Sequence, residues 1–307
     1  MANFIVIFIC MAAGIVLQRS KRFPEKAAQA FNAWVIFLAY PAVILVQFPL
    51  LIESTPFDRE LILPVSMAWL LFIASWILFS NLGKKFGWSR ATTGALILTA
   101  GLGNTSFLGF PLLEALMGPE AVRYAILNDQ PGSFLVISTL GLFVAATYAG
   151  ATVNAQIVAT RIAKFPPFVA MVLAIVWYLI GLPGFDLLRM PLERVASTLV
   201  PVALFAVGLQ MKFKFFDLKA QRFELATGLA FKLFLAPIVF FAAYKLLLGE
   251  IDLVTHVTIL ESAMAPMITA AILATEFDLD TQLANLMVGL GIPISLLTIP
   301  IWHMLIS

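Results

Sequence analysis

Long runs of apolar residues follow one another along almost the whole chain, and this pattern limits the fold more than any other feature. Several runs exceed the ~18 residues that a helix needs to cross the hydrocarbon core of a bilayer. Only 12% of the residues are charged, about half of the share usual in water-soluble domains. The sequence therefore predicts an all-α membrane protein with about ten transmembrane helices, at residues 3–18, 28–50, 61–82, 91–117, 121–149, 167–182, 195–211, 225–248, 253–276 and 281–305.

The Lys and Arg side chains are distributed unevenly between the predicted loops. Thirteen of the 19 lie in the loops after the first, third, fifth and seventh spans, and five lie in the alternate loops. Because cytoplasmic loops carry the excess of basic residues, we expect a multi-pass protein of the bacterial inner membrane with both termini periplasmic. The first apolar segment has no basic residues before it and no clear cleavage site, so we interpret it as a span and not as a secretory signal.

The two halves of the sequence share landmarks when one half is shifted along the other. A shift of 162 residues places Asn104 on Pro266, and further prolines coincide in the same register. Five spans per half is an odd number, so the halves must lie inverted in the membrane, as in many secondary transporters. We therefore predict a first five-helix repeat at residues 1–149 and a second, inverted repeat at residues 150–307.

The fourth and ninth predicted spans each carry signals for a break near the middle of the bilayer. In the fourth span, glycines at 101 and 103 precede three residues that favour helix N-termini. In the ninth span, Pro266 lacks a backbone N–H and suits the first turn of a new half-helix. Two facing half-helix N-termini present N–H groups and positive dipole ends, which favour an anion. The residues predicted to bind substrate are Gly103, Asn104, Thr105, Ser106, Ala265, Pro266 and Met267.

Two carboxylates lie several residues inside predicted spans. Asp129 is in the fifth span and Glu261 is in the ninth, and an acidic residue in hydrocarbon is costly enough to suggest a function. With Asn128, they predict a site for Na⁺ or for a proton; the alternative is that both carboxylates are structural. Lys232, inside the eighth span, is explained most simply by snorkelling to the membrane surface, with pairing to a carboxylate as the alternative.

Motifs of known enzyme classes are not found in the sequence. There is no H-E-x-x-H, G-x-S-x-G, phosphate-binding loop or dinucleotide fingerprint, so we expect no enzymatic activity and no resident cofactor besides Na⁺. Cys10, the single cysteine, excludes an internal disulfide.

The stretch from Gly103 to Gly118 carries a family resemblance. It reads G-N-T-S-F-L-G-F-P-L-L-E-A-L-M-G and resembles the pattern N-T-x-x-x-G-x-P-L-L-x-A-x-x-G of the auxin efflux carrier family, which includes the plant PIN proteins. The segments 263–266, 274–277 and 289–293 are similar to the second crossover region of the same family. The chain departs from the plant pattern at Gly103, where proline is usual, and lacks the long loop between the fifth and sixth spans.

The resemblance implies a ten-helix transporter of the bile-acid/arsenite/riboflavin superfamily. Spans 1, 2, 6 and 7 would form a scaffold, and spans 3–5 and 8–10 would form a moving core in which the broken helices 4 and 9 cross. Bacterial relatives are described as exporters or permeases of malonate, malate or auxin-like carboxylates. Sodium-coupled relatives carry a glutamate just before the second crossover, where Glu261 stands in this chain.

These observations predict a secondary active transporter of a small organic anion, working by elevator-type alternating access and coupled to a cation. The alternatives are a passive uniporter or channel for organic anions, and a membrane receptor that binds a carboxylate without moving it. The expected partners are the small organic anion and the lipid bilayer, with no nucleic acid; a homodimer is one assembly compatible with the sequence.

Overall fold

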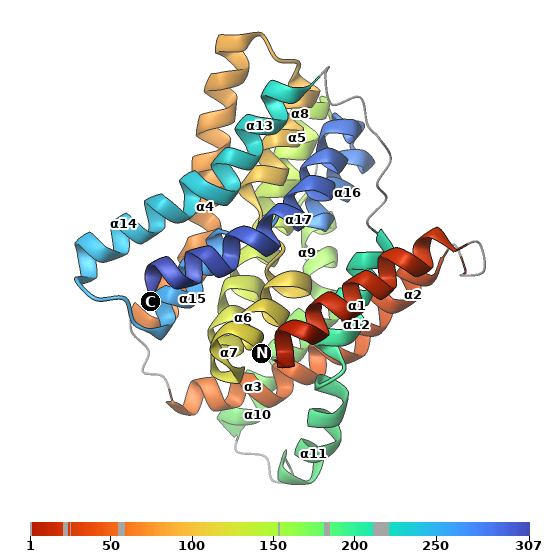
Figure 1. Cartoon of the computed structure of the whole chain (residues 1–307), viewed down its shortest axis with the longest axis vertical. Helices are drawn as coiled ribbons and strands as arrows, with labels where there is room; N and C mark the ends of the chain where they lie inside the picture. Colours follow the sequence, from red (N-terminus) through yellow and green to blue (C-terminus); the bar gives the residue numbers. More distant parts are fainter. Residues whose placement is uncertain are drawn as a thin grey trace. The chain divides into compact units, whose positions relative to one another are not determined.

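The computed structural model describes residues 2–20, 24, 26–54, 59–152, 154–180, 185–210 and 221–307 (Figure 1). In these residues the regular structure is helical, with one isolated β-bridge and no strand. Five of the basic residues that set the expected orientation lie outside the described residues, namely Lys21, Arg22, Lys212, Lys214 and Lys219.

Six helical stretches of the described chain are long and apolar enough to cross a membrane. They are Ala27–Glu53, Leu61–Phe86, Pro119–Ala149, Leu187–Gln210, Arg222–Leu248 and Thr281–Ile306. The helices Ala155–Ala163 and Pro166–Ile180 pass the same test only when they are taken together, which raises the number to seven. The protein is thus a multi-pass membrane protein, whereas the ten-span inverted repeat stays a prediction, because the other apolar helices are short or interrupted.

Contacts divide the chain into two compact units. Unit 1 comprises Met1–Asp58, Ser106–Ile126 and Ile162–Lys212, and unit 2 comprises Arg59–Thr105, Leu127–Arg161 and Phe213–Ser307. Short π-helical segments, labelled η, interrupt the α-helices in both units.

In unit 1, helix α1 packs along α12, and α3 packs against α10 and α11. The approach of α1 to α12 depends on two glycines, since a Cβ at Gly208 would lie 3.1 Å from the Cα of Gly14. The elements of this unit are α1 (Ala2–Arg19), α2 (Ala27–Trp34), η1 (Val35–Ala39), α3 (Tyr40–Ser54), η2 (Thr105–Gly109, whose first residue belongs to unit 2), α6 (Phe110–Met117), α7 (Pro119–Leu127), α10 (Pro166–Ile180), α11 (Phe185–Ala196) and α12 (Leu199–Gln210).

In unit 2, helices α5 and α15 form the interior. Every residue from Thr93 to Gly101 in α5 and from Val254 to Ser262 in α15 is buried, and α4 packs against both helices. The elements of this unit are α4 (Arg59–Phe86), α5 (Arg90–Gly101), η3 (Asn128–Phe134), η4 (Ile137–Gly141), α8 (Leu142–Ala149), α9 (Ala155–Ala163), α13 (Arg222–Ala230), η5 (Phe231–Leu235), α14 (Ala236–Leu248), α15 (Leu253–Ser262), α16 (Ile268–Glu276) and α17 (Thr281–Ile306).

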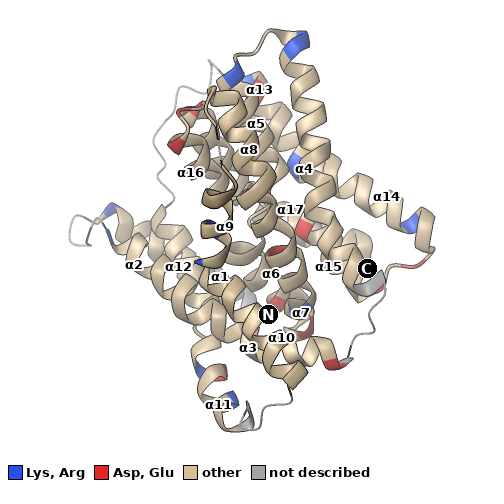
Figure 2. Cartoon of the chain, turned by 180° about the vertical axis from the view of Figure 1, so that it is seen from behind, with Lys and Arg blue, Asp and Glu red and all other residues tan. Residues whose placement is uncertain are grey.

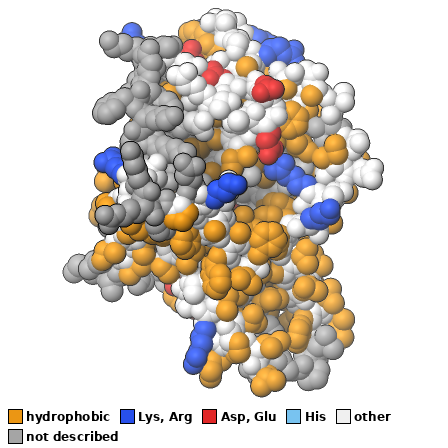
Figure 3. Space-filling model, turned by 90° about the vertical axis from the view of Figure 1, so that its right-hand side faces the viewer, with side chains coloured by type: hydrophobic (Ala, Val, Ile, Leu, Met, Phe, Trp, Pro, Cys, Tyr) orange, Lys and Arg blue, Asp and Glu red, His pale blue; other side chains and the backbone are white. Residues whose placement is uncertain are grey.

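The surface has the chemistry expected of a protein surrounded by lipid. Large apolar side chains are exposed, for example Leu179 (75%), Leu187 (80%) and Leu246 (86%), and such side chains cover much of the face in Figure 3. Most charged residues lie near helix ends, and only a few lie along the helices (Figure 2). Three charged residues, Asp129, Lys232 and Glu261, are buried in unit 2.

Candidate functional site: a crossing of two broken helices

The chain is interrupted in unit 2 at the first position that the sequence predicted. Helix α5 ends at Gly101, and Leu102 is extended, with φ −124° and ψ 129°. The next helical segment, η2, begins at Thr105. Helix formation thus stops at the glycine pair and resumes at the residues that favour N-termini.

The second interruption lies between α15, which ends at Ser262, and α16, which begins at Ile268. Met267, just before α16, is extended, with φ −67° and ψ 129°. Proline at 266 cannot donate a backbone hydrogen bond, so the helix cannot continue through this segment with its full set of bonds.

The two interruptions cross each other as a short antiparallel β-bridge between Gly103 and Pro266. The N–H of Asn104 donates to the carbonyl of Ala265 over 2.7 Å, and the N–H of Met267 donates to the carbonyl of Leu102 over 3.0 Å. We expected free N–H groups at both half-helix starts, but these two N–H groups hold the crossing together. Any backbone N–H groups that bind a ligand must therefore come from the first turn of η2 or of α16. The N–H groups of a first helical turn have no acceptor within their own helix.

The side chain of Asn104 is the clearest candidate for ligand binding at the crossing. It is 3% exposed, and its amide nitrogen, Nδ2, has no hydrogen-bond acceptor among the described residues. Buried amide donors are normally paired, and an unpaired one costs about 1–3 kcal/mol. An acceptor supplied from outside the protein would remove that cost.

Lys232 lies at the crossing, which corrects the expectation that it snorkels to the membrane surface. Its side chain is fully buried, and its ammonium donates to the carbonyl of Ser262, the last residue of α15, over 2.6 Å. A Cβ at Gly103 would lie 3.2 Å from the Lys232 Nζ atom, so the absence of a side chain at 103 leaves room for the ammonium. This contact gives a physical reason for glycine at the position where the family pattern usually has proline.

The local backbone explains how the eighth predicted span accommodates Lys232. The residue lies in the π-helical segment η5, whose wider turn changes the direction of the side chains relative to an α-helix. Pro237, near the start of α14, cannot donate to the carbonyl of Leu233, and the indole of Trp302 donates to that carbonyl instead over 3.0 Å. A tertiary hydrogen bond therefore replaces the missing helical one.

Glu261, in the last turn of α15, is fully buried, and none of the described residues donates a hydrogen bond to either carboxylate oxygen. Its charge interacts with those of Asp129 and Lys232. The interaction with Lys232 favours the alternative that the sequence offered for this lysine, pairing with a carboxylate, over snorkelling.

Asp129 has nearby partners of its own. One carboxylate oxygen accepts a hydrogen bond from the hydroxyl of Thr105, and the other accepts one from the amide of Gln130 over 2.7 Å. Thr105 was predicted to bind substrate, but its hydroxyl is directed to Asp129. Asn128, the third residue of the predicted cation site, is fully buried in η3.

Some oxygen atoms at the crossing already have partners, whereas both carboxylate oxygens of Glu261 have no donor among the described residues. Hard cations take several oxygen ligands, but both oxygens of Asp129 accept hydrogen bonds and the Ser262 carbonyl binds an ammonium. In the part of the chain that the structure describes, there is no cluster of three or more His, Cys, Asp or Glu side chains suited to a metal.

Further polar side chains of interest are Ser106 and two histidines. Ser106, the remaining predicted substrate residue in the first interruption, is half-buried and belongs to unit 1. In unit 2, ring nitrogens of His256 and His303 lie 3.1 Å apart and link α15 to α17.

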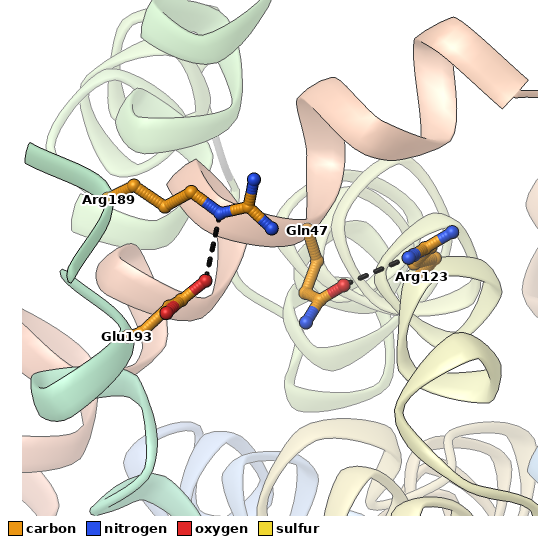
Figure 4. A network of polar contacts seen from close by, with 4 residues as sticks. All are labelled: Gln47, Arg123, Arg189 and Glu193. Atoms are coloured by element: carbon orange, nitrogen blue, oxygen red, sulfur yellow. Dashed lines mark hydrogen bonds and ion pairs between the residues drawn. The ribbon is translucent and has the colours of Figure 1, made fainter. Parts of the chain in front are cut away.

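A separate polar network lies in unit 1 (Figure 4). Arg123 donates to the Gln47 side-chain oxygen over 3.2 Å, and Arg189 forms an ion pair with Glu193 at 2.9 Å. Gln47 and Glu193 also line a cavity of about 180 Å³ in the same unit. The network also contains two arginines, neither of which the sequence analysis predicted as a site residue.

Comparison with known proteins shows to which family the chain belongs. A family model described as "Membrane transport protein" matches residues 1–303. An uncharacterised transporter of Methanothermobacter thermautotrophicus is 26% identical over 300 residues, covering 98% of this chain and 96% of the relative. Another, of Methanocaldococcus jannaschii, is 29% identical over 287 residues, covering 91% and 89%. The uncharacterised transporter YfdV of Escherichia coli is 26% identical over 323 residues, covering 98% and 95%. The chain therefore belongs to the membrane transport protein family, that of the auxin efflux carriers.

Proposed function

We propose that the protein is a secondary active transporter that binds a small organic anion at the crossing of α5–η2 and α15–α16. The observation that carries this proposal is the buried amide of Asn104, whose nitrogen has no acceptor among the described residues. It lies at the start of one half-helix, beside a second half-helix start, and both supply the positive dipole ends that favour an anion. A carboxylate oxygen would satisfy this donor, in keeping with a substrate such as malonate, malate or an auxin-like acid.

We expect Asn104→Ala to weaken carboxylate binding roughly 5- to 150-fold, which corresponds to about 1–3 kcal/mol for losing one buried hydrogen-bond partner. The probe is whichever of malonate, malate and indole-3-acetate raises the unfolding temperature of the purified protein most, and its affinity is measured by titration calorimetry. Asn81→Ala is the control, because Asn81 is exposed and its amide already donates to the carbonyl of Ile77. Equal affinities of a folded Asn104→Ala variant and the parent protein would contradict the proposed binding site.

The transport mechanism that we propose is elevator-type alternating access, coupled to a cation. Its support is that both interruptions, from Leu102 to Thr105 and from Ala263 to Met267, belong to one compact unit. Unit 2 would thus contain most of the moving core, and unit 1 would contain the scaffold together with Ser106–Ile126, which the resemblance assigns to the core. A passive uniporter would use the same binding site without a coupling ion, and a receptor would use it without transport.

We further propose an inner-membrane location with both termini periplasmic, on the basis of the thirteen-to-five distribution of basic residues. A periplasm-dependent reporter, such as alkaline phosphatase, fused after Ser307 should be active. Activity of a cytoplasm-dependent reporter at the same position would contradict this orientation.

A further inference from the structure

The end of α15 is suited to a positive charge. A helix C-terminus carries a partial negative charge on carbonyls that have no partner within the helix. Here the carbonyl of Ser262 is such a group, and the acidic side chains of Glu261, one residue earlier, and of Asp129 are buried in the same unit. Two ionised acidic side chains and a helix C-terminus buried in one unit would repel each other unless a cation or a shared proton lay nearby.

The protein supplies that cation from its own chain. The Lys232 ammonium binds the Ser262 carbonyl at 2.6 Å, is fully buried, and interacts with the charge of Glu261. On the other side, Gly103 lies close to the ammonium: a Cβ added at Gly103 would be 3.2 Å from the Lys232 Nζ atom. The space beside the end of α15 is therefore filled by the lysine.

We infer that Lys232 is a tethered cation that takes the place of a coupling sodium ion at the crossing, so that the transporter works without sodium. This inference rests on the proposed function for the claim that the protein transports a substrate. The position of the cation does not depend on the substrate. A sodium ion placed beside Ser262 would have to displace the ammonium or lie next to it against charge repulsion. Of the two coupling ions considered for this site, the proton remains.

The first test compares thermal unfolding of the purified full-length protein, without substrate, in sodium chloride and in potassium chloride of equal concentration. The two midpoints should be equal, because the site already holds its cation. A midpoint higher in sodium by about 2 °C or more, as expected for specific binding to the folded state, would overturn the inference.

The second test removes the lysine side chain, which leaves space for a small cation. Lys232→Ala should lower the midpoint, and methylammonium, which restores the amine in the space of the missing side chain, should raise it by about 2 °C or more relative to potassium. Lys245→Ala is the matched control: Lys245 is exposed further along α14, so its variant should not respond to methylammonium. A folded Lys232→Ala variant that no small cation stabilises would overturn the inference; if this variant does not fold, the sodium–potassium comparison on the parent protein decides.

A third measurement separates this inference from the proposed function. Uptake of the labelled carboxylate into proteoliposomes should be unchanged when choline replaces sodium, and a tenfold loss of uptake would overturn sodium independence. Absence of carboxylate uptake in both salts would instead contradict the proposed function, while the unfolding comparison would still report on the cation at the crossing.

Discussion

Replacing Lys232 by methionine is expected to destabilise the protein by on the order of 3 kcal/mol, the scale found when one member of a buried pair of charges is removed. Methionine keeps the length and apolar part of the side chain but loses the ammonium. The Ser262 carbonyl then loses its donor, and the buried Glu261 carboxylate loses the one positive charge with which it interacts among the described residues. The free energy of unfolding in detergent, from denaturant titration, measures the loss.

The double variant Lys232→Met/Glu261→Gln tests whether this loss comes from charge balance. If the two charges compensate each other, the double variant should be more stable than the sum of the two single effects by about 0.5–3 kcal/mol, the usual range for coupled neighbours. Strictly additive effects in this cycle would mean that Lys232 and Glu261 are independent, and the charge-balance explanation would be wrong.

Adding one methyl group at Gly291, in α17, is expected to disturb the crossing through contact with Pro266. A Cβ there would lie 2.9 Å from Cγ of the Pro266 ring and 3.3 Å from the Leu229 Cδ2 atom. The proline ring cannot rotate away, so Gly291→Ala should lower the free energy of unfolding by about 1–3 kcal/mol, as overpacking does in other cores. It should also weaken carboxylate binding, because Pro266 is one partner of the bridge to Gly103.

The same helix provides a matched control. A Cβ at Gly289 would meet nothing within 4 Å. Gly289→Ala should therefore be neutral or more stable by up to about 1 kcal/mol, since alanine favours a helix over glycine. Equal effects of the two alanine variants in the same unfolding experiment would show that close packing against Pro266 is not what requires glycine at 291.

The positions of the helix breaks could be predicted from the sequence because their causes are local. Glycines at 101 and 103, the N-cap residues that follow and Pro266 determine which backbone hydrogen bonds can form, whatever the tertiary structure. That the two breaks pair was suggested by the shift that aligns Asn104 with Pro266. The bridge itself joins Gly103 to Pro266, one residue from that alignment.

The direction of the Lys232 side chain could not be predicted in the same way. Its distance from the membrane surface along the chain is compatible with snorkelling, and the choice depends on a π-helical turn, on Trp302 and on a carbonyl of another helix. A sequence signal did exist: the glycine at 103, where the family pattern has proline, leaves room for an ammonium at this position. Similarly, the hydrogen bond from Thr105 to Asp129 depends on how η3 packs in unit 2, which local patterns do not encode.

The most direct test of the proposed transport activity is counterflow in proteoliposomes. Vesicles loaded with unlabelled carboxylate are diluted into a trace of the labelled compound, and a carrier with one binding site should accumulate label transiently above its equilibrium level. We predict such an overshoot for the parent protein and for Asn81→Ala, and its loss in Asn104→Ala at the same trace concentration. Simple equilibration of the label without an overshoot would indicate a channel, and an overshoot that survives in Asn104→Ala would contradict substrate binding at the crossing of the two broken helices.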